Sequence, residues 1–163
     1  MITGVQERLW QVARRLATDD DVAADLVQES LVRAYRSLPR LKDPERFLPW
    51  LLRILNHLAA DMLGKPGTLS LEALAEAGVN LPAPDRDGPE ARADSRHTGE
   101  AADRALRAMP LIYRQPLVLR HVLDWPYHEI AEVLGWPLGT VKTRLIRGRE
   151  LLREHLLREG IHP

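Results

Sequence analysis

The sequence predicts an all-α fold in which two small helical domains are joined by a flexible linker. Apolar residues recur at intervals near 3.6 residues in both halves of the chain, and no stretch alternates between polar and apolar residues as a strand would. Between the halves the composition shifts to Gly, Pro, Ala, Asp and Glu, which is typical of a linker. We therefore expect domains over residues 1–64 and 99–163, with the linker over 65–98.

Three helices are expected in the N-terminal domain. Apolar residues between positions 9 and 16 share one face of the first helix. The acidic run 18–21 offers side-chain acceptors and negative charge at the N-terminus of the second helix, which continues to about Leu38. Another apolar face over 47–58 predicts the third helix, which Gly64 ends.

Four helices are expected in the C-terminal domain, over 101–109, 111–122, 126–134 and 138–157. Gly135 stands between the last two and can adopt the positive φ that a tight turn between helices requires. The last two helices are therefore predicted to form a helix-turn-helix.

Charge is distributed unevenly along the chain. The whole chain carries 23 basic and 23 acidic residues, so its net charge is zero. The linker has four basic and six acidic side chains, which gives it a net charge of −2. Between Lys142 and Arg153 there are five basic side chains and one acidic side chain, a local charge of +4. This concentration of charge, rather than the total, predicts a surface for nucleic acid.

Composition excludes several classes of protein. The sequence has no cysteine, which excludes disulfides, thiol catalysis and cysteine-ligated zinc. Its six histidines lack a metal-ligand spacing, and Ser30 and Ser70 lie in no nucleophile-like turn, so we expect no enzyme, metal or cofactor. Neither a signal peptide nor an apolar run long enough for membrane insertion is visible. We expect the protein to act in the cytoplasm.

The last predicted helix has an apolar face and a polar face. Val141, Leu145, Gly148 and Leu152 share the apolar face, at spacings of four, three and four residues. Thr140, near the helix N-terminus, is placed to contact a phosphate. The polar face carries side chains that can contact bases in the major groove, namely Lys142, Thr143, Ile146, Arg147 and Arg149. A solvated face on a structural helix is the alternative, and the preceding EIAxxLG turn favours DNA reading.

Two stretches of the chain resemble the extracytoplasmic-function (ECF) sigma factors of bacterial RNA polymerase. The C-terminal stretch, similar to the family's region four, reads MPLIYRQPLVLRHVLDWPYHEIAEVLGWPLGTVKTRLIRGRELL. The N-terminal domain is similar to region two through DLVQESLVRAYRSL and FLPWLLRILNHLAADML. The two matches stand in the family's order and cover about four fifths of the residues. The resemblance implies a two-domain sigma factor with an acidic linker that threads the RNA exit path of the polymerase.

The resemblance implies partners and site residues for both domains. Core RNA polymerase is contacted at its β′ clamp by region two and at its β flap by region four. The clamp contact would be made by Asp25, Gln28, Glu29, Arg33 and Arg36. Apart from Gln28, these residues also form a polar stripe, which in most helices is only solvated.

Promoter DNA is the second implied partner. The resemblance implies that residues 40–46 and the helix after them engage the minus-ten element and capture an unstacked base, and the candidates there are Lys42, Arg46 and Asn56. The nearby Phe47 and Trp50 could assist strand opening, but they are expected in the core, because they lie at helical spacing with apolar neighbours. Candidates for the minus-thirty-five element are Thr140, Lys142, Thr143, Arg144, Ile146, Arg147 and Arg149, and Arg144 has bracing of the domain as an alternative.

Three features differ from the family's usual pattern. The chain begins late in the family's first helix, so a few N-terminal residues are expected to be absent. Lys65 alone represents the basic cluster that usually follows the position of Asp61. Gly148 stands where the family usually has Ala.

The function implied is promoter-specific transcription initiation by an alternative sigma factor, controlled by an anti-sigma factor. A stand-alone helix-turn-helix regulator is the main alternative, with residues 1–64 serving for dimerisation or ligand binding and the dimer reading palindromic DNA. A protein-interaction adaptor is a weaker one. Association with core RNA polymerase separates these hypotheses.

Overall fold

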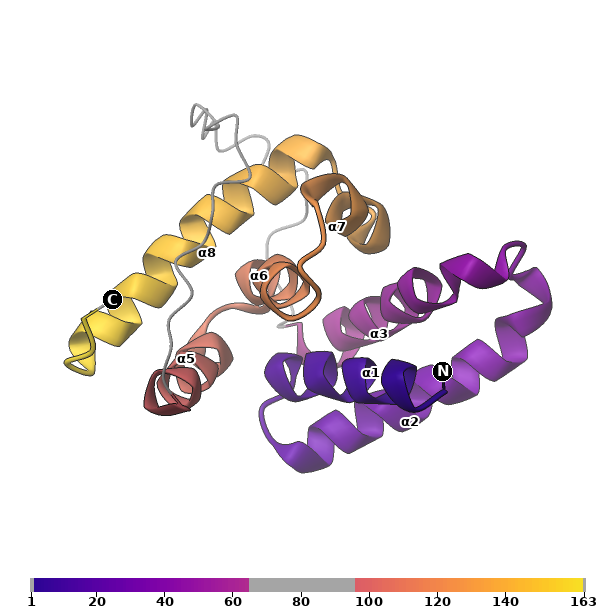
Figure 1. Ribbon diagram of the computed structural model, residues 1–163, viewed down its shortest axis with the longest axis horizontal. Coiled ribbons are helices and arrows are strands. Elements are labelled where there is room, and N and C mark those ends of the chain that lie inside the picture. Colours follow the sequence, from indigo (N-terminus) through magenta and orange to yellow (C-terminus); the bar gives the residue numbers. More distant parts are fainter. Residues whose placement is uncertain (1, 65–95, 163) are drawn as a thin grey trace.

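The computed structural model describes residues 2–64 and 96–162, and the regular structure in these two stretches is entirely helical (Figure 1). The prediction of an all-α fold is confirmed. The elements, with two 3-10 turns labelled η, are α1 (Ile2–Leu16), α2 (Asp20–Ser37), η1 (Leu38–Arg40), η2 (Pro44–Arg46), α3 (Phe47–Leu63), α5 (Arg96–Ala108), α6 (Leu111–Leu123), α7 (Tyr127–Leu134) and α8 (Leu138–Arg158).

Helix α2 begins within the predicted acidic run. Asp19 has extended backbone angles, with φ of −152° and ψ of 175°, and its side chain accepts a hydrogen bond from the Val22 backbone N–H at 2.8 Å. This cap satisfies one of the N–H groups that the start of a helix leaves without a backbone partner.

The segment between α2 and α3 makes two short turns. Asp43 caps the second of them, because its side chain accepts a hydrogen bond from the Glu45 backbone N–H at 3.0 Å. The turns leave the side chain of Lys42 exposed and end at Arg46, which is the N-cap residue of α3.

Helix α5 begins earlier than the sequence predicts, at Arg96 instead of Ala101. The first residue of this helix that is shown buried is Ala101, with none of its surface exposed. Before it the helix has no apolar repeat, so periodicity could not reveal that turn. The rest of the predicted linker, residues 65–95 with Lys65, lies outside the described residues.

The predicted helix-turn-helix is formed by α7 and α8. Gly135 has φ of 69°, as expected for its place in the turn, and the next residue, Trp136, donates its backbone N–H to Ala131 O at 3.0 Å. Farther along α8, a Cβ added to Gly148 would lie 2.8 Å from Leu117 Cδ1 of α6. Glycine at this position therefore permits the close approach of α8 to α6.

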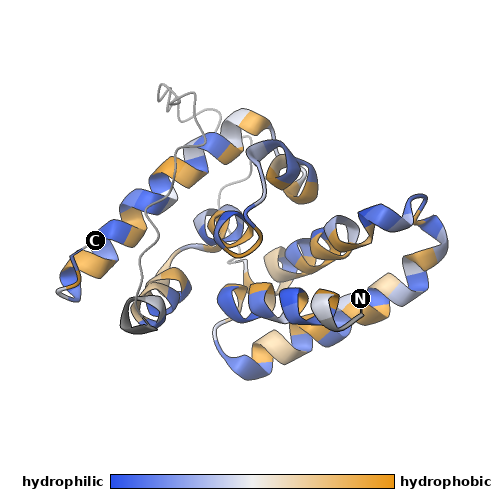
Figure 2. Ribbon diagram, in the orientation of Figure 1, coloured by the Kyte–Doolittle hydropathy of each residue, from blue (hydrophilic) through white to orange (hydrophobic). Residues whose placement is uncertain are grey.

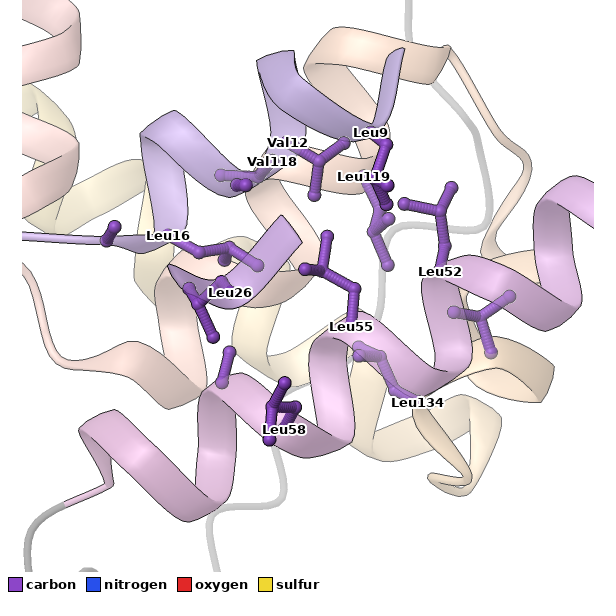
Figure 3. Packing of buried hydrophobic residues seen from close by; sticks show 14 of the residues in the cluster. Leu9, Val12, Leu16, Leu26, Leu52, Leu55, Leu58, Val118, Leu119 and Leu134 are labelled. Carbon is purple, nitrogen blue, oxygen red and sulfur yellow. The ribbon is translucent and has the colours of Figure 1, made fainter. Parts of the chain in front are cut away.

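One apolar cluster includes residues from both halves of the chain. Helix α1 packs against α6, and α3 packs against α7. Figure 3 shows Val118 and Leu119 of α6 close to Val12 and Leu9 of α1, and all four side chains are fully buried. Burial of each such side chain contributes about 1.5–3 kcal/mol. The two predicted domains are thus held together by apolar contact in this structure.

Candidate nucleic-acid and polymerase surfaces

Helix α8 has an apolar face and a polar face. In Figure 2 the two faces appear as hydrophobic and hydrophilic bands that alternate along the helix. Val141, Leu145 and Gly148 are buried, as predicted, and Leu152, predicted on the same face, is partly buried. Six of the seven predicted contacts to the minus-thirty-five element keep exposed surface: Thr140, Lys142, Thr143, Ile146, Arg147 and Arg149. The structure therefore brings these six side chains together on the outer face of one helix, which is the arrangement that enters a major groove.

Several side chains on this face are held by neighbours. The Thr143 hydroxyl donates to Gly139 O at 2.9 Å, and Arg147 forms an exposed ion pair with Glu150 at 3.1 Å. Such an ion pair is weak because water competes for both charges, so Arg147 can exchange Glu150 for a base or phosphate.

Arg149 is positioned by an aromatic side chain of α7. Its two terminal nitrogens donate to the Tyr127 hydroxyl at 3.3 and 3.4 Å. The Tyr127 ring in turn lies beneath the guanidinium of Arg120, 5.6 Å from its centroid. The contact of Tyr127 with Arg149 was not predicted from the sequence. The two residues are 22 positions apart, and no pattern around Tyr127 indicates the contact.

Arg144 differs from the other predicted contacts on α8. Only 5% of its surface is exposed, and its guanidinium stacks on the Trp136 ring at 4.1 Å from the centroid. Burial lowers the pKa of Arg144 from its ordinary value. This placement corresponds to the alternative of bracing the domain, rather than to the exposed face that was predicted to read DNA.

A second basic surface lies where η1, η2 and α3 meet. A hollow of about 310 Å³ there is lined by Arg40, Leu41, Lys42, Asp43, Arg46, Pro49, Trp50, Arg53, Glu132 and Val133. Lys42 and Arg46, both predicted for the minus-ten element, are therefore brought together in it. Of the aromatic pair assigned to the core, Trp50 lines the hollow and is only partly buried, with its ring 5.9 Å from that of Phe47.

Arg40 and Arg53 line the same hollow. Both lie in the stretch that the resemblance assigns to the minus-ten element, but neither was named as a candidate. Arg53 stands seven residues after Arg46, which is two helical turns, so helical spacing could have placed both on one face. Arg40 lies in a 3-10 turn, whose geometry the apolar pattern does not reveal.

Asn56 lies apart from the other two minus-ten candidates. It is fully buried, its Nδ2 donates to Leu52 O at 2.9 Å, and its backbone oxygen accepts a hydrogen bond from Gln115 Nε2 at 3.0 Å. Its Oδ1 faces no hydrogen-bond partner. Asn56 thus joins α3 to α6, and its predicted role in the base pocket does not fit this arrangement of the two halves.

Arg46 is paired with two carboxylates of α7. Its terminal nitrogens donate to Glu129 at 3.0 and 3.3 Å, and one of them also lies 3.0 Å from Glu132. The hydrogen bonds that Arg46 donates to Glu129, with the charges of Glu129 and Glu132, raise the pKa of Arg46 above its ordinary value. These contacts join residues that are more than 80 positions apart in the chain.

The predicted polymerase contacts lie on α2 beside exposed apolar side chains. Asp25, Gln28 and Arg36 are exposed, and Glu29 pairs with Arg33 at 3.1 Å. A shallow hollow of about 530 Å³ lies on the same helix and is lined by Gln28, Leu31, Val32, Tyr35 and Arg36. The ring of Tyr35 is the most exposed part, with 81% of the residue accessible. A mixed apolar and charged surface of this kind is suited to a protein partner.

Within 2–64 and 96–162, no three His, Asp or Glu side chains gather into a possible metal site. No helix in these stretches is both long enough and apolar enough to span a membrane.

Comparison with known proteins relates both halves to one group of proteins. The family model for sigma-70 region 2 matches residues 1–67, and that for sigma-70, region 4 matches residues 99–152. The ECF RNA polymerase sigma factor SigE of Mycolicibacterium smegmatis is 36% identical over 154 residues, which are 94% of this chain and 59% of SigE. The ECF RNA polymerase sigma factor SigW of Bacillus subtilis is 31% identical, with coverage of 93% of this chain and 84% of SigW.

A solved structure has the same fold. It is that of the sigma factor RpoE in complex with the anti-sigma factor NepR from Bartonella quintana, with a TM-score of 0.69 and 24% identity. The match covers 96% of this chain and 94% of that one. The chain thus aligns over nearly its whole length with that fold, although it spans less than two thirds of SigE.

Proposed function

The chain belongs to the ECF RNA polymerase sigma factor family, and we propose that it binds core RNA polymerase and directs initiation at specific promoters. The observation that supports this most strongly is the outer face of α8, where Lys142, Arg147 and Arg149 keep exposed surface on a helix-turn-helix. Arginine and lysine on such a helix can form bidentate hydrogen bonds with guanine. This face is proposed to read the minus-thirty-five element.

The hollow at η1, η2 and α3 is proposed to hold the unstacked strand of the minus-ten element. Arg40, Lys42, Arg46 and Arg53 supply cations for the phosphates, and Trp50 supplies an aromatic surface for a base. This set keeps two of the three residues predicted from the sequence and replaces Asn56 by neighbours that line the same hollow.

Helix α2 is proposed to bind the polymerase. Tyr35, Leu31 and Val32 would be covered by the β′ clamp, and the charged side chains around them would fix the register of the contact. The contact between region four and the β flap remains a proposal from the family resemblance. The protein is proposed to act in the cytoplasm, where the polymerase is.

An anti-sigma factor is proposed as a further partner. The related RpoE structure contains such a protein, NepR. The region 2 match over residues 1–67 favours a sigma factor over a stand-alone helix-turn-helix regulator, because it accounts for the N-terminal half without a dimerisation or ligand domain.

Association with purified core RNA polymerase tests the proposal. Asp25→Ala combined with Glu29→Ala removes two charges of the α2 surface and leaves Arg33 without its partner, so we expect about tenfold weaker binding to core enzyme. Fluorescence titration of labelled protein with core enzyme measures this.

The matched control is Glu7→Ala with Glu154→Ala, which changes the net charge equally at two exposed positions away from α2. Circular dichroism checks that both variants are folded. Failure of the unmodified protein to bind core enzyme would overturn the proposed function, and equal binding by both double variants would overturn the role of α2.

A further inference from the structure

Helix α7 carries two carboxylates that lie on the basic surface of η2 and α3. We propose that the face of α7 with Glu129 and Glu132 is an internal partner of the minus-ten surface, occupying Arg46 in the place of promoter DNA. The inference rests on the proposed function in one respect, the assignment of this surface to the minus-ten strand. The binding of α7 to the surface stands on the geometry.

The contact between the two surfaces is specific in its geometry. Glu129 and Glu132 are three residues apart, so they point from the same side of α7. Arg46 lies between them, with two nitrogens on Glu129 and one on Glu132, at 3.0 to 3.3 Å. A guanidinium binds a carboxylate and a phosphate with the same fork of N–H donors. The carboxylates therefore use the donors that a DNA phosphate would need.

The same helix also closes one side of the hollow. Glu132 and Val133 of α7 form part of its wall, together with Lys42 and Trp50. A strand that enters the hollow and approaches Arg46 meets the charge of Glu132 and the bulk of α7. DNA binding at this surface thus requires α7 to move away.

The ion pairs of Arg46 with Glu129 and Glu132 are weak enough to break reversibly. Side chains of Arg46 and Glu132 are 40% and 62% exposed, and Glu129 is 23% exposed, so water and salt weaken both ion pairs. The buried apolar contacts of α1 with α6 and of α3 with α7 also hold the two halves together. The ion pairs therefore adjust an equilibrium between closed and open arrangements, which a polyanionic strand can shift by competing for Arg46.

An intramolecular distance measurement tests this inference. The chain has no cysteine, so Ala24→Cys on α2 and Arg158→Cys on α8 allow donor and acceptor dyes to be attached for energy transfer. Glu129→Gln with Glu132→Gln removes both charges and keeps the side-chain shape. We expect this variant to raise the ratio of open to closed molecules about threefold to tenfold, because it loses two partly exposed ion pairs that stabilise the closed arrangement. Transfer in the unmodified protein should also fall with added KCl, and in the variant it should be lower at low salt and should depend less on salt.

A second measurement follows binding of a fluorescein-labelled pool of short single-stranded DNA of mixed sequence. The glutamine variant should bind it more tightly by a similar factor, and the control Glu7→Gln with Glu154→Gln, which makes the same change in net charge, should behave as the unmodified protein. Unchanged energy transfer in the glutamine variant would overturn the inference, and so would opening without tighter DNA binding. Loss of core-polymerase binding with normal opening would overturn the proposed function and leave the contact of α7 with Arg46 standing.

Discussion

At the scale of single residues, the contacts proposed for promoter reading on α8 depend on a few arginines whose surroundings differ. Arg147 is exposed and weakly paired, Arg149 is held by the Tyr127 hydroxyl, and Arg144 is buried against Trp136. Arginine is therefore proposed to serve as a base contact and as a positioned contact on the helix in which it also forms a structural stack. Only the first two are available to DNA in this structure.

Arg147→Ala tests the exposed member of this group. We expect about tenfold weaker binding to the upstream promoter element and relaxed preference at one base position, because a bidentate contact with a base is lost. Fluorescence anisotropy against a panel of single-base variants of that element measures both effects. Arg158→Ala, at the last residue of α8, is the charge-matched control. Equal loss in both variants would contradict a base-reading role for Arg147.

At the scale of the helices, local signals account for most boundaries. Asp19 caps α2, Gly135 turns the chain between α7 and α8, and Gly148 lets α8 approach α6. Asp19 and Gly135 act through the backbone within a few residues, so the sequence alone could predict them, whereas Gly148 acts through a contact with Leu117 of another helix. Contacts between the halves act differently: Arg46 with α7, and Asn56 with Gln115, join segments far apart in the chain. Apolar periodicity shows which face of a helix is buried and not which helix covers it, so these contacts could not be predicted.

Asp19→Ala measures the contribution of a local signal. We expect a loss of about 1 kcal/mol in the free energy of unfolding, because the Val22 N–H loses its acceptor. Urea denaturation followed by circular dichroism gives the value. Asp21→Ala removes the same charge from the first turn without removing the cap and should cost only a few tenths of a kcal/mol, about the size of a helix-dipole contribution. A larger loss for Asp21→Ala than for Asp19→Ala would contradict the capping role.

At the scale of the whole molecule, the two halves share an apolar cluster and an electrostatic contact. Val118 and Leu119 of α6 are buried against α1, and α7 covers part of the surface proposed for the minus-ten strand. The α2 surface and the outer face of α8 stay exposed in the same arrangement. A closed molecule would thus still present the surfaces proposed for polymerase and for upstream DNA while the surface proposed for the minus-ten strand is covered. On this proposal, opening is the step that makes the three surfaces available together.

Promoter-dependent initiation is the most direct test of the proposed function. Purified core RNA polymerase is mixed with the protein and with fragmented bacterial DNA, and the transcripts are sequenced to map their start sites. A sigma factor produces start sites that are absent with core enzyme alone and that share two sequence elements, near positions minus thirty-five and minus ten. A set of starts identical to that of core enzyme alone, obtained with folded protein, would contradict the assignment.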